Sequence, residues 1–172
     1  MMKKLVLILL CLPFGLSAQE EGFKMDQKDV SSIDGLIEAL YDVISGPAGE
    51  PRNWDRFRGL FTKDANLCAL GKDKEGKIRY RSMSVEDYVK GPGEYLIKNG
   101  FFEVELSRER DEFGLVTQLF STYESRSKKE GPVIARGINS IQIAFFDDRY
   151  WLVNILWNAE SPDNPIPQQY LK

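Results

Sequence analysis

The chain has 172 residues, with 23 basic and 26 acidic side chains and no histidine. Without histidine it lacks the commonest general base and the commonest metal ligand. The charges are interspersed along the chain, so no basic surface for nucleic acid or anionic lipid is predicted. The sequence contains no cysteine cluster for zinc, no glycine-rich phosphate loop and no nucleophile motif. It therefore predicts no metal, no cofactor and no nucleic-acid partner.

Residues 1–18 have the pattern of a secretory signal peptide. Lys3 and Lys4 form a basic start, a largely apolar stretch of twelve residues follows, and Ser17 and Ala18 are small residues before a polar segment. Twelve residues are too few to span a bilayer as a helix, which favours a cleaved signal over an uncleaved N-terminal anchor. Cleavage leaves 154 residues, about one domain, with a net charge of −5. We expect a periplasmic or secreted protein with no stable membrane span.

The mature chain retains one cysteine, Cys68, because Cys11 lies in the signal peptide. An intramolecular disulfide is therefore excluded. Free cysteine is among the most buried residue types, so a buried small side chain is favoured. The alternative, a nucleophile, would lack its usual histidine partner.

A polar lead-in, residues 19–30, is expected to be loose, and the folded domain is expected over residues 31–160. Ser31 or Ser32 caps the first helix, which ends at Gly46 and Pro47. Its apolar residues share one helical face and are Ile33, Leu36, Ile37, Leu40, Tyr41 and Ile44.

Two further helices are predicted. Asn53 caps the second, whose apolar face consists of Trp54, Phe57, Leu60 and Phe61. A hairpin over residues 66–70 and 77–83 follows. Ser84 then opens a third helix with a capping-box spacing, and the helix is broken or kinked by residues 91–93 before it stops at residues 99–100.

The last third of the domain predicts long antiparallel strands, at residues 115–126, 133–146 and 150–159, after an alternating strand that begins at Phe102. Alternation places Phe102, Val104 and Leu106 inward and leaves the 115–126 strand ambiguous. In the last two strands the inward sets are Val133, Ala135, Gly137, Asn139, Ile141, Ile143 and Phe145, and Trp151, Val153, Ile155 and Trp157. The tail, residues 161–172, carries three prolines and is expected to be extended.

The predicted interior suggests a ligand pocket. Asn139 is the clearly polar residue of an apolar face, and a buried amide needs partners. It is either satisfied structurally, by Tyr123 or backbone, or available to a small molecule. Aromatic side chains would complete the wall, although each is also a common core residue. The candidate pocket residues are Tyr41, Trp54, Phe57, Tyr88, Tyr123, Asn139 and Trp157.

The carboxylates argue against catalysis, because a pocket general base must face inward, where desolvation raises its pKa. Glu124 is the one inward candidate, and Arg126 on the same face is a ready ion-pair partner. The acids that the patterns place outward are Asp34, Asp42, Asp55, Glu103 and Glu105.

Three N-terminal helices followed by a meander of long strands resemble the nuclear transport factor 2-like superfamily, within it the polyketide-cyclase-like (SnoaL-like) and lumazine-binding groups. The resemblance covers most of residues 31–159 and is carried by residues 33–37, 54–57, 60–61, 120–124, 137–142 and 150–155. It implies an α+β cone-shaped barrel, with three N-terminal helices packed against a curled, mostly antiparallel sheet. It also implies a cavity and a homodimer formed through the outer sheet face.

These observations predict an exported domain that binds a small apolar or aromatic ligand, with no evident catalytic machinery. One alternative is an isomerase- or dehydratase-type enzyme that uses Glu124 or Tyr123. The other is a dimeric structural or interaction module. Fold likeness alone does not choose among them.

Overall fold

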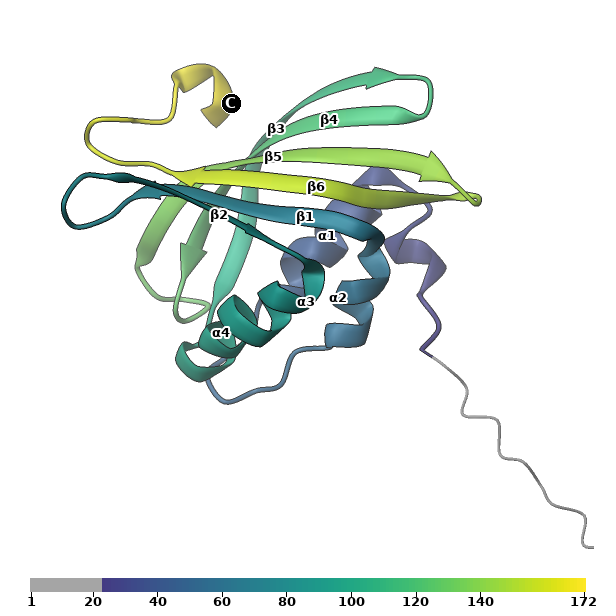
Figure 1. Cartoon of the computed structure of the whole chain (residues 1–172), viewed down its shortest axis with the longest axis horizontal. Helices are drawn as coiled ribbons and strands as arrows, with labels where there is room; N and C mark the ends of the chain where they lie inside the picture. The colour runs from purple at the N-terminus through teal and green to yellow at the C-terminus, as the bar shows by residue number, and fades with distance from the viewer. Residues whose placement is uncertain (1–22) are drawn as a thin grey trace, which may run out of the picture.

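The computed structural model describes residues 23–172 (Figure 1). The predicted signal peptide and the start of the lead-in lie outside the described residues. Within residues 23–172, no helix is both long and apolar enough to cross a membrane.

The helices begin at the predicted capping residues. In α1 (Ile33–Ile44) the Ser32 hydroxyl accepts a hydrogen bond from the Gly35 amide. In α2 (Trp54–Leu60) the Asn53 side chain accepts one from the Arg56 amide. Phe61, predicted as the end of this second helix, instead begins a strand. A full capping box opens α3 (Val85–Tyr88), with Ser84 as its first member.

The predicted kink in the third helix is a π-helical turn, Val89–Gly93, which joins α3 to α4 (Glu94–Asn99). Proline has no backbone N–H to donate, and the wider π-helical turn accommodates Pro92 without ending the helix. Gly93 also matters for packing, because a Cβ atom there would lie 2.9 Å from the Trp54 ring. The continuous but bent helix therefore packs closely against α2.

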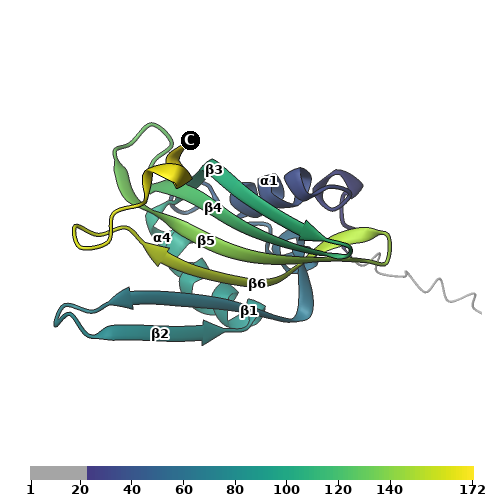
Figure 2. The ribbon, with the colours of Figure 1, turned by 90° about the horizontal axis from the view of Figure 1, so that it is seen from above.

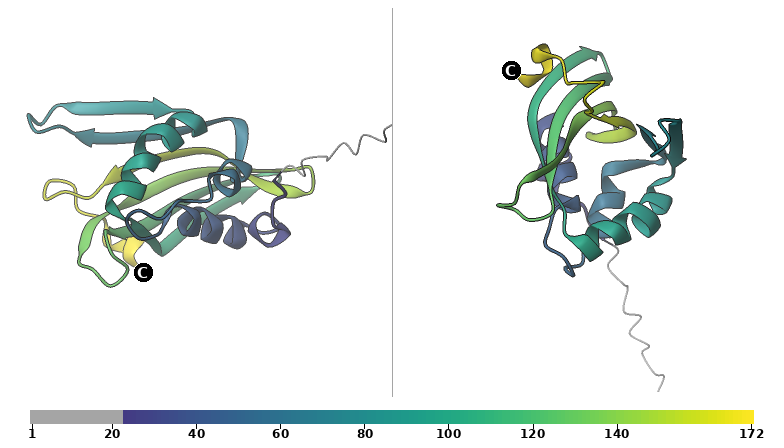
Figure 3. Two further views of the ribbon diagram at one scale, coloured as in Figure 1. Left: turned by 90° about the horizontal axis from the view of Figure 1, so that it is seen from below. Right: turned by 90° about the vertical axis from the view of Figure 1, so that its left-hand side faces the viewer.

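Six strands form one mixed sheet in the order β2-β1-β6-β5-β4-β3. The β1–β6 pair is parallel and the other four pairs are antiparallel. The sheet curls around the helices without closing into a barrel (Figures 2 and 3). This confirms the predicted α+β class. The strands are β1 (Phe61–Lys72), β2 (Ile78–Met83), β3 (Phe102–Phe113), β4 (Val116–Arg126), β5 (Val133–Phe146) and β6 (Arg149–Ala159).

The core lies between α1 and the concave face of the sheet. Its fully buried side chains include Leu36, Ile37, Leu119, Ile141 and Leu152. Each such side chain stabilises the fold by roughly 1.5–3 kcal/mol relative to an exposed position. Cys68 is buried, as predicted.

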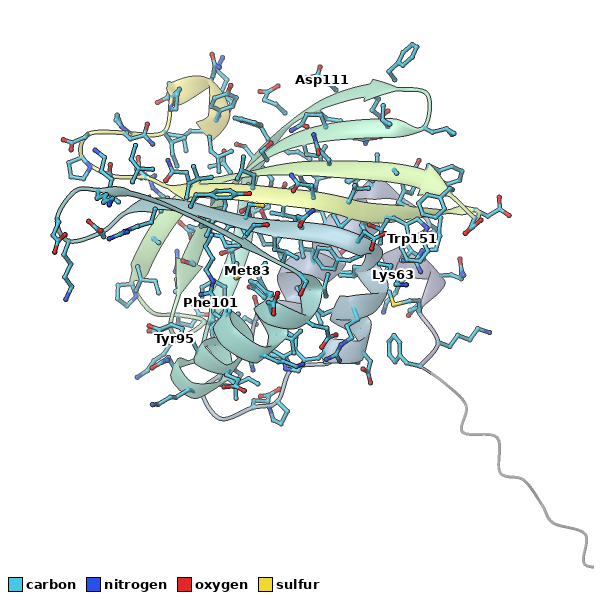
Figure 4. All side chains as sticks on the ribbon, viewed as in Figure 1. Lys63, Met83, Tyr95, Phe101, Asp111 and Trp151 are labelled. Atoms are coloured by element: carbon cyan, nitrogen blue, oxygen red, sulfur yellow. The ribbon has the colours of Figure 1, made fainter. Side chains whose placement is uncertain are left out.

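One β-bulge changes which residues of β6 face the core. Gln142 pairs with Asn154, but Ile143 pairs with Leu152, so Val153 is an extra residue. The prediction that Trp151 and Val153 face inward is therefore wrong, and Leu152 is buried instead. Trp151 stacks on Phe146 at the hairpin end of the sheet (Figure 4).

The two ends of the described chain are more ordered than predicted. In the lead-in, Asp29 is buried and accepts a hydrogen bond from Arg56 Nε at 2.6 Å, and Val30 is fully buried. The tail turns into a short helix at Gln168–Leu171, and the Tyr170 carbonyl oxygen accepts the Thr122 hydroxyl at 2.7 Å. The tail thus covers part of the outer sheet face (Figure 1). The homodimer through this face stays a prediction, and such an interface would have to include or displace the tail.

Arg52 holds the segment that joins α1 to α2. Its guanidinium is buried and donates to the carbonyl oxygens of Ile44, at 3.1 Å, and of Gly46 and Glu50, both at 2.6 Å. Gly46 in turn pairs with Phe101 through two backbone hydrogen bonds, of 2.6 and 3.0 Å. The end of α1 is thereby fixed to the start of β3.

Replacing this guanidinium should destabilise the protein strongly. Arg52→Met leaves several partly buried carbonyl oxygens without a donor, so we expect a loss of about 2–4 kcal/mol in the free energy of unfolding. Urea denaturation measures it. Arg58→Met is the control, because Arg58 forms exposed ion pairs with Asp55 and Glu86 and such pairs contribute at most about 1 kcal/mol. Equal losses in the two variants would contradict this assignment.

Candidate functional site

A cavity of about 280 Å³ lies between the bent α3–α4 helix, the C-terminal half of α1 and the concave face of the sheet. Aromatic side chains form much of its wall, including Phe101 at the end of the sheet next to α4 (Figure 4). The lining consists of the aromatic residues Phe57, Tyr88, Phe101, Tyr123 and Trp157, the aliphatic residues Leu40, Ile44, Leu67, Pro92, Leu96, Ala135 and Ile155, and the polar residues Glu103, Ser125 and Asn139.

The structure brings together five of the seven residues proposed from sequence, namely Phe57, Tyr88, Tyr123, Asn139 and Trp157. The other two stand behind the wall. Tyr41 reaches Asn139 from α1 through a hydrogen bond, and Trp54 packs edge-on against Phe57 with ring centroids 5.6 Å apart.

Ring packing fixes the aromatic walls. Tyr88 stacks on Phe57 at 5.2 Å and meets Trp157 edge-on at 6.5 Å. On the opposite strands, Tyr123 pairs with Gly137, where a Cβ atom would lie 2.5 Å from the Tyr123 hydroxyl. Glycine at this position therefore gives the tyrosine ring the space to lie across β5.

Asn139 is satisfied by α1 rather than by Tyr123 or the backbone. Its Nδ2 donates to the Tyr41 hydroxyl at 3.0 Å, and that hydroxyl lies 2.7 Å from the Ser121 hydroxyl. Ser121 donates onward to the Glu105 carboxylate at 2.5 Å. Because the Tyr41 hydroxyl accepts a hydrogen bond from Asn139, its own proton points to Ser121. The chain of hydrogen bonds therefore runs in one direction, from Asn139 in the cavity to the Glu105 carboxylate.

Glu103 is the functional candidate that the sequence pattern missed. It is half-buried on β3 and is the only charged side chain in the cavity lining. Burial raises the pKa of Glu103 to about 8, and interaction with the Asn139 side chain acts in the opposite direction. Such a carboxyl is largely protonated at neutral pH.

The negative charge of ionised Glu103 also acts on the surrounding phenols. Burial raises the pKa of Tyr41, Tyr88 and Tyr123 well above the ordinary tyrosine value, and the Glu103 charge adds to each shift. The three hydroxyl groups therefore stay protonated across the range in which Glu103 titrates.

An irregular register in β3 explains why alternation in the sequence predicts an outward Glu103 although the side chain faces the cavity. Ser107 pairs with Thr122, but Glu105 pairs with Tyr123, so Leu106 is an extra residue. Without it, Leu106 would pair with Tyr123 and the predicted inward set would hold. With it, Val104 and Leu106 are exposed and Glu103 and Glu105 face the helices.

Glu124, the acid proposed from sequence, is not part of the cavity. It forms an ion pair with Arg126 and lines a neighbouring open cleft of about 820 Å³ along α1 and β3, which Glu103 also borders. In that cleft Arg108 is similarly paired with Asp34 and Glu105. These ion pairs account for part of the polarity of the cleft.

No protein-family model matches the chain, and no curated protein does. Nor do the described residues contain a cluster of three or more carboxylate or cysteine side chains placed to hold a metal ion.

Solved structures identify the fold. The chain is similar to a protein of unknown function with a cystatin-like fold from Nostoc punctiforme, with a TM-score of 0.57 and 11% identity over 78% of this chain and 92% of that one. It is similar to an NTF-2-like protein from Silicibacter pomeroyi (0.51, 12%, 76% and 94%) and to LinA (0.56, 7%, 76% and 85%). The protein thus has the cystatin-like, nuclear transport factor 2-like fold predicted from its sequence. At identities this low, the structural similarity establishes the fold alone, and the function has to be argued from the site.

The raised pKa of Glu103 should appear as a pH-dependent stability. Glutamate in the unfolded chain ionises near pH ~4.3, so between there and the folded value of about 8 unfolding releases a proton and stability falls as pH rises. Glu103→Gln removes this loss. We expect the variant to gain on the order of 3 kcal/mol relative to wild type between about pH 5 and pH 9, measured by urea unfolding at both values.

Glu124→Gln is the matched control, since that carboxylate is ion-paired with Arg126 and does not line the cavity. It should keep the pH dependence of the wild type. A Glu103→Gln variant with the same pH dependence as wild type would show that the Glu103 carboxyl is well solvated.

Proposed function

We propose that the protein binds a small, largely apolar molecule in the cavity. The observation that supports this most directly is a hollow of about 280 Å³ walled by five aromatic rings and holding one carboxyl and one amide. Protein interiors are otherwise packed to crystal-like density. A volume slightly below the ~300–1,000 Å³ typical of ligand pockets suits a molecule of about ten non-hydrogen atoms.

The composition of the wall supports the same proposal. Apolar and aromatic surface provides affinity, while a few polar groups fix orientation. Glu103 and Asn139 supply those groups here, and Asn139 is held in place by Tyr41. The alternative of a purely structural module predicts an interior filled by its own side chains, which does not agree with the hollow.

Proton transfer is a second candidate, favoured by one observation. With a pKa of about 8, Glu103 can donate or accept a proton near neutral pH. In this version Glu103 replaces Glu124 as the acid–base residue, and Tyr123 remains in the wall. Turnover that survives Glu103→Gln would exclude it.

Export remains part of the proposal and rests on the sequence of residues 1–18. Their basic start, apolar stretch and small residues before Gln19 fit a cleaved signal peptide. A periplasmic or extracellular protein that retains this segment would argue for the anchored alternative.

Ligand binding can be tested with indole, a neutral aromatic probe of suitable size. At about ten times its Kd it should stabilise the wild type by about 1.4 kcal/mol and raise Tm by roughly 3 °C. Ala135→Leu places a larger side chain in the cavity wall and should abolish the shift. Differential scanning calorimetry measures both.

Ala159→Leu is the control, because Ala159 is exposed near the end of β6. This variant should respond to indole as the wild type does. No shift in wild type, or an equal shift in Ala135→Leu, would contradict binding in the cavity.

A further inference from the structure

We propose that the ligand of this cavity is a small organic cation, an ammonium compound held by Glu103 and the surrounding aromatic rings. This rests on the proposed function, since it names the chemical class of the molecule that the cavity binds.

The charges of the lining favour a cation over an anion. Glu103 is the one charged side chain among the residues that line the cavity, and no lysine or arginine lies in the cavity wall. Glu103 also borders the open cleft, where Arg108 and Arg126 are ion-paired with other acids. An anionic ligand would meet a carboxyl in a low-dielectric space with no positive group to balance its charge. A cation would instead supply the positive charge that balances the ionised Glu103 carboxylate.

Glu103 differs from Glu105 and Glu124 in having no counter-ion. Glu105 is paired with Arg108 and Glu124 with Arg126. Within residues 23–172, no basic side-chain nitrogen lies within 4.0 Å of the Glu103 carboxylate oxygens. An ionised carboxylate in a low-dielectric cavity is normally balanced by a positive charge, so the position of Glu103 favours a cation that comes from outside.

The aromatic rings provide the second half of the recognition. Tyr88, Tyr123 and Trp157 border the same cavity as Glu103, and the packing of Tyr88 against Phe57 and Trp157 fixes its ring. Ring faces carry negative electrostatic potential and attract ammonium groups, most strongly where water is excluded. Aromatic rings with one acid form a site that alkylammonium groups fit.

Binding should be coupled to the release of one proton. The free carboxyl is largely protonated at neutral pH, and the bound cation favours its ionised form, so the proton leaves to solvent as the cation enters. The groups that interact with Glu103 from the helices and the sheet are Tyr41 from α1, Tyr88 from α3, Tyr123 from β4 and the uncharged Asn139 from β5. The open cleft that Glu103 also borders adds the charged side chains of Asp42, Glu105, Arg108, Glu124, Arg126 and Lys129. The three tyrosines stay protonated between pH ~5 and ~9. The Glu103→Gln variant identifies the released proton as that of Glu103.

The test compares choline with its uncharged carbon isostere, 3,3-dimethylbutan-1-ol, by isothermal titration calorimetry at about pH 9. We expect wild type to bind choline at least about tenfold more tightly than the alcohol. In Glu103→Gln the preference should fall to about twofold or less, and in Glu124→Gln it should be unchanged. Titrations at neutral pH in two buffers of different ionisation enthalpy should show release of up to one proton in wild type and none in Glu103→Gln.

Equal or tighter binding of the alcohol in wild type would overturn the proposal, as would a choline preference that survives Glu103→Gln. Binding of indole without binding of choline would also overturn it and leave the proposed function intact. Failure of indole, choline and the alcohol alike would reject both.

Discussion

One extra residue in the β3–β4 ladder, Leu106, determines the chemistry of the interior. A regular ladder would place Val104 and Leu106 against the helices and both neighbouring glutamates in solvent. The bulge reverses the orientation of the side chains in the first residues of β3. As a result, Glu103 lines the cavity and the Glu105 carboxylate accepts a hydrogen bond from Ser121. Two apolar side chains are exposed as a result. The arrangement exposes two apolar side chains and places a carboxyl in the interior. Such a combination is expected at a functional site rather than in a purely structural core.

The surrounding structure holds β3 in this shifted register. The Glu103 amide donates to the Ser45 hydroxyl at 3.0 Å, and that hydroxyl donates to the Tyr41 carbonyl oxygen at 2.7 Å. Together with the Gly46–Phe101 pair, these bonds fix the edge strand to the end of α1. The same helix carries Tyr41, whose hydroxyl orients Asn139. The C-terminal half of α1 thus positions both Glu103 and Asn139.

Much of the fold could be predicted from sequence, because caps, helical periodicity and turn residues are local signals. Ser32, Asn53 and Ser84 cap the helices as their side-chain chemistry requires, and alternation correctly placed Asn139 and Ile141 inward. The errors of strand orientation, in β3, in β6 and at Val133 of β5, which is exposed, have one cause. Each lies at a bulge, and an inserted residue reverses the alternation beyond it. The aromatic wall could be anticipated because its residues lie on regular faces. Glu103 could not, since its inward direction depends on a register that only the pairing with β4 reveals.

The central claim is that the Glu103 carboxyl is desolvated in an aromatic cavity and has no counter-ion. The most direct measurement is a carbon-13 NMR pH titration of the Glu103 side-chain carboxyl in the ligand-free protein, assigned with the Glu103→Gln variant. We expect a titration midpoint near the folded value of about 8. A midpoint near ~4.3, the value of a glutamate in water, would show a solvated carboxyl and contradict the account.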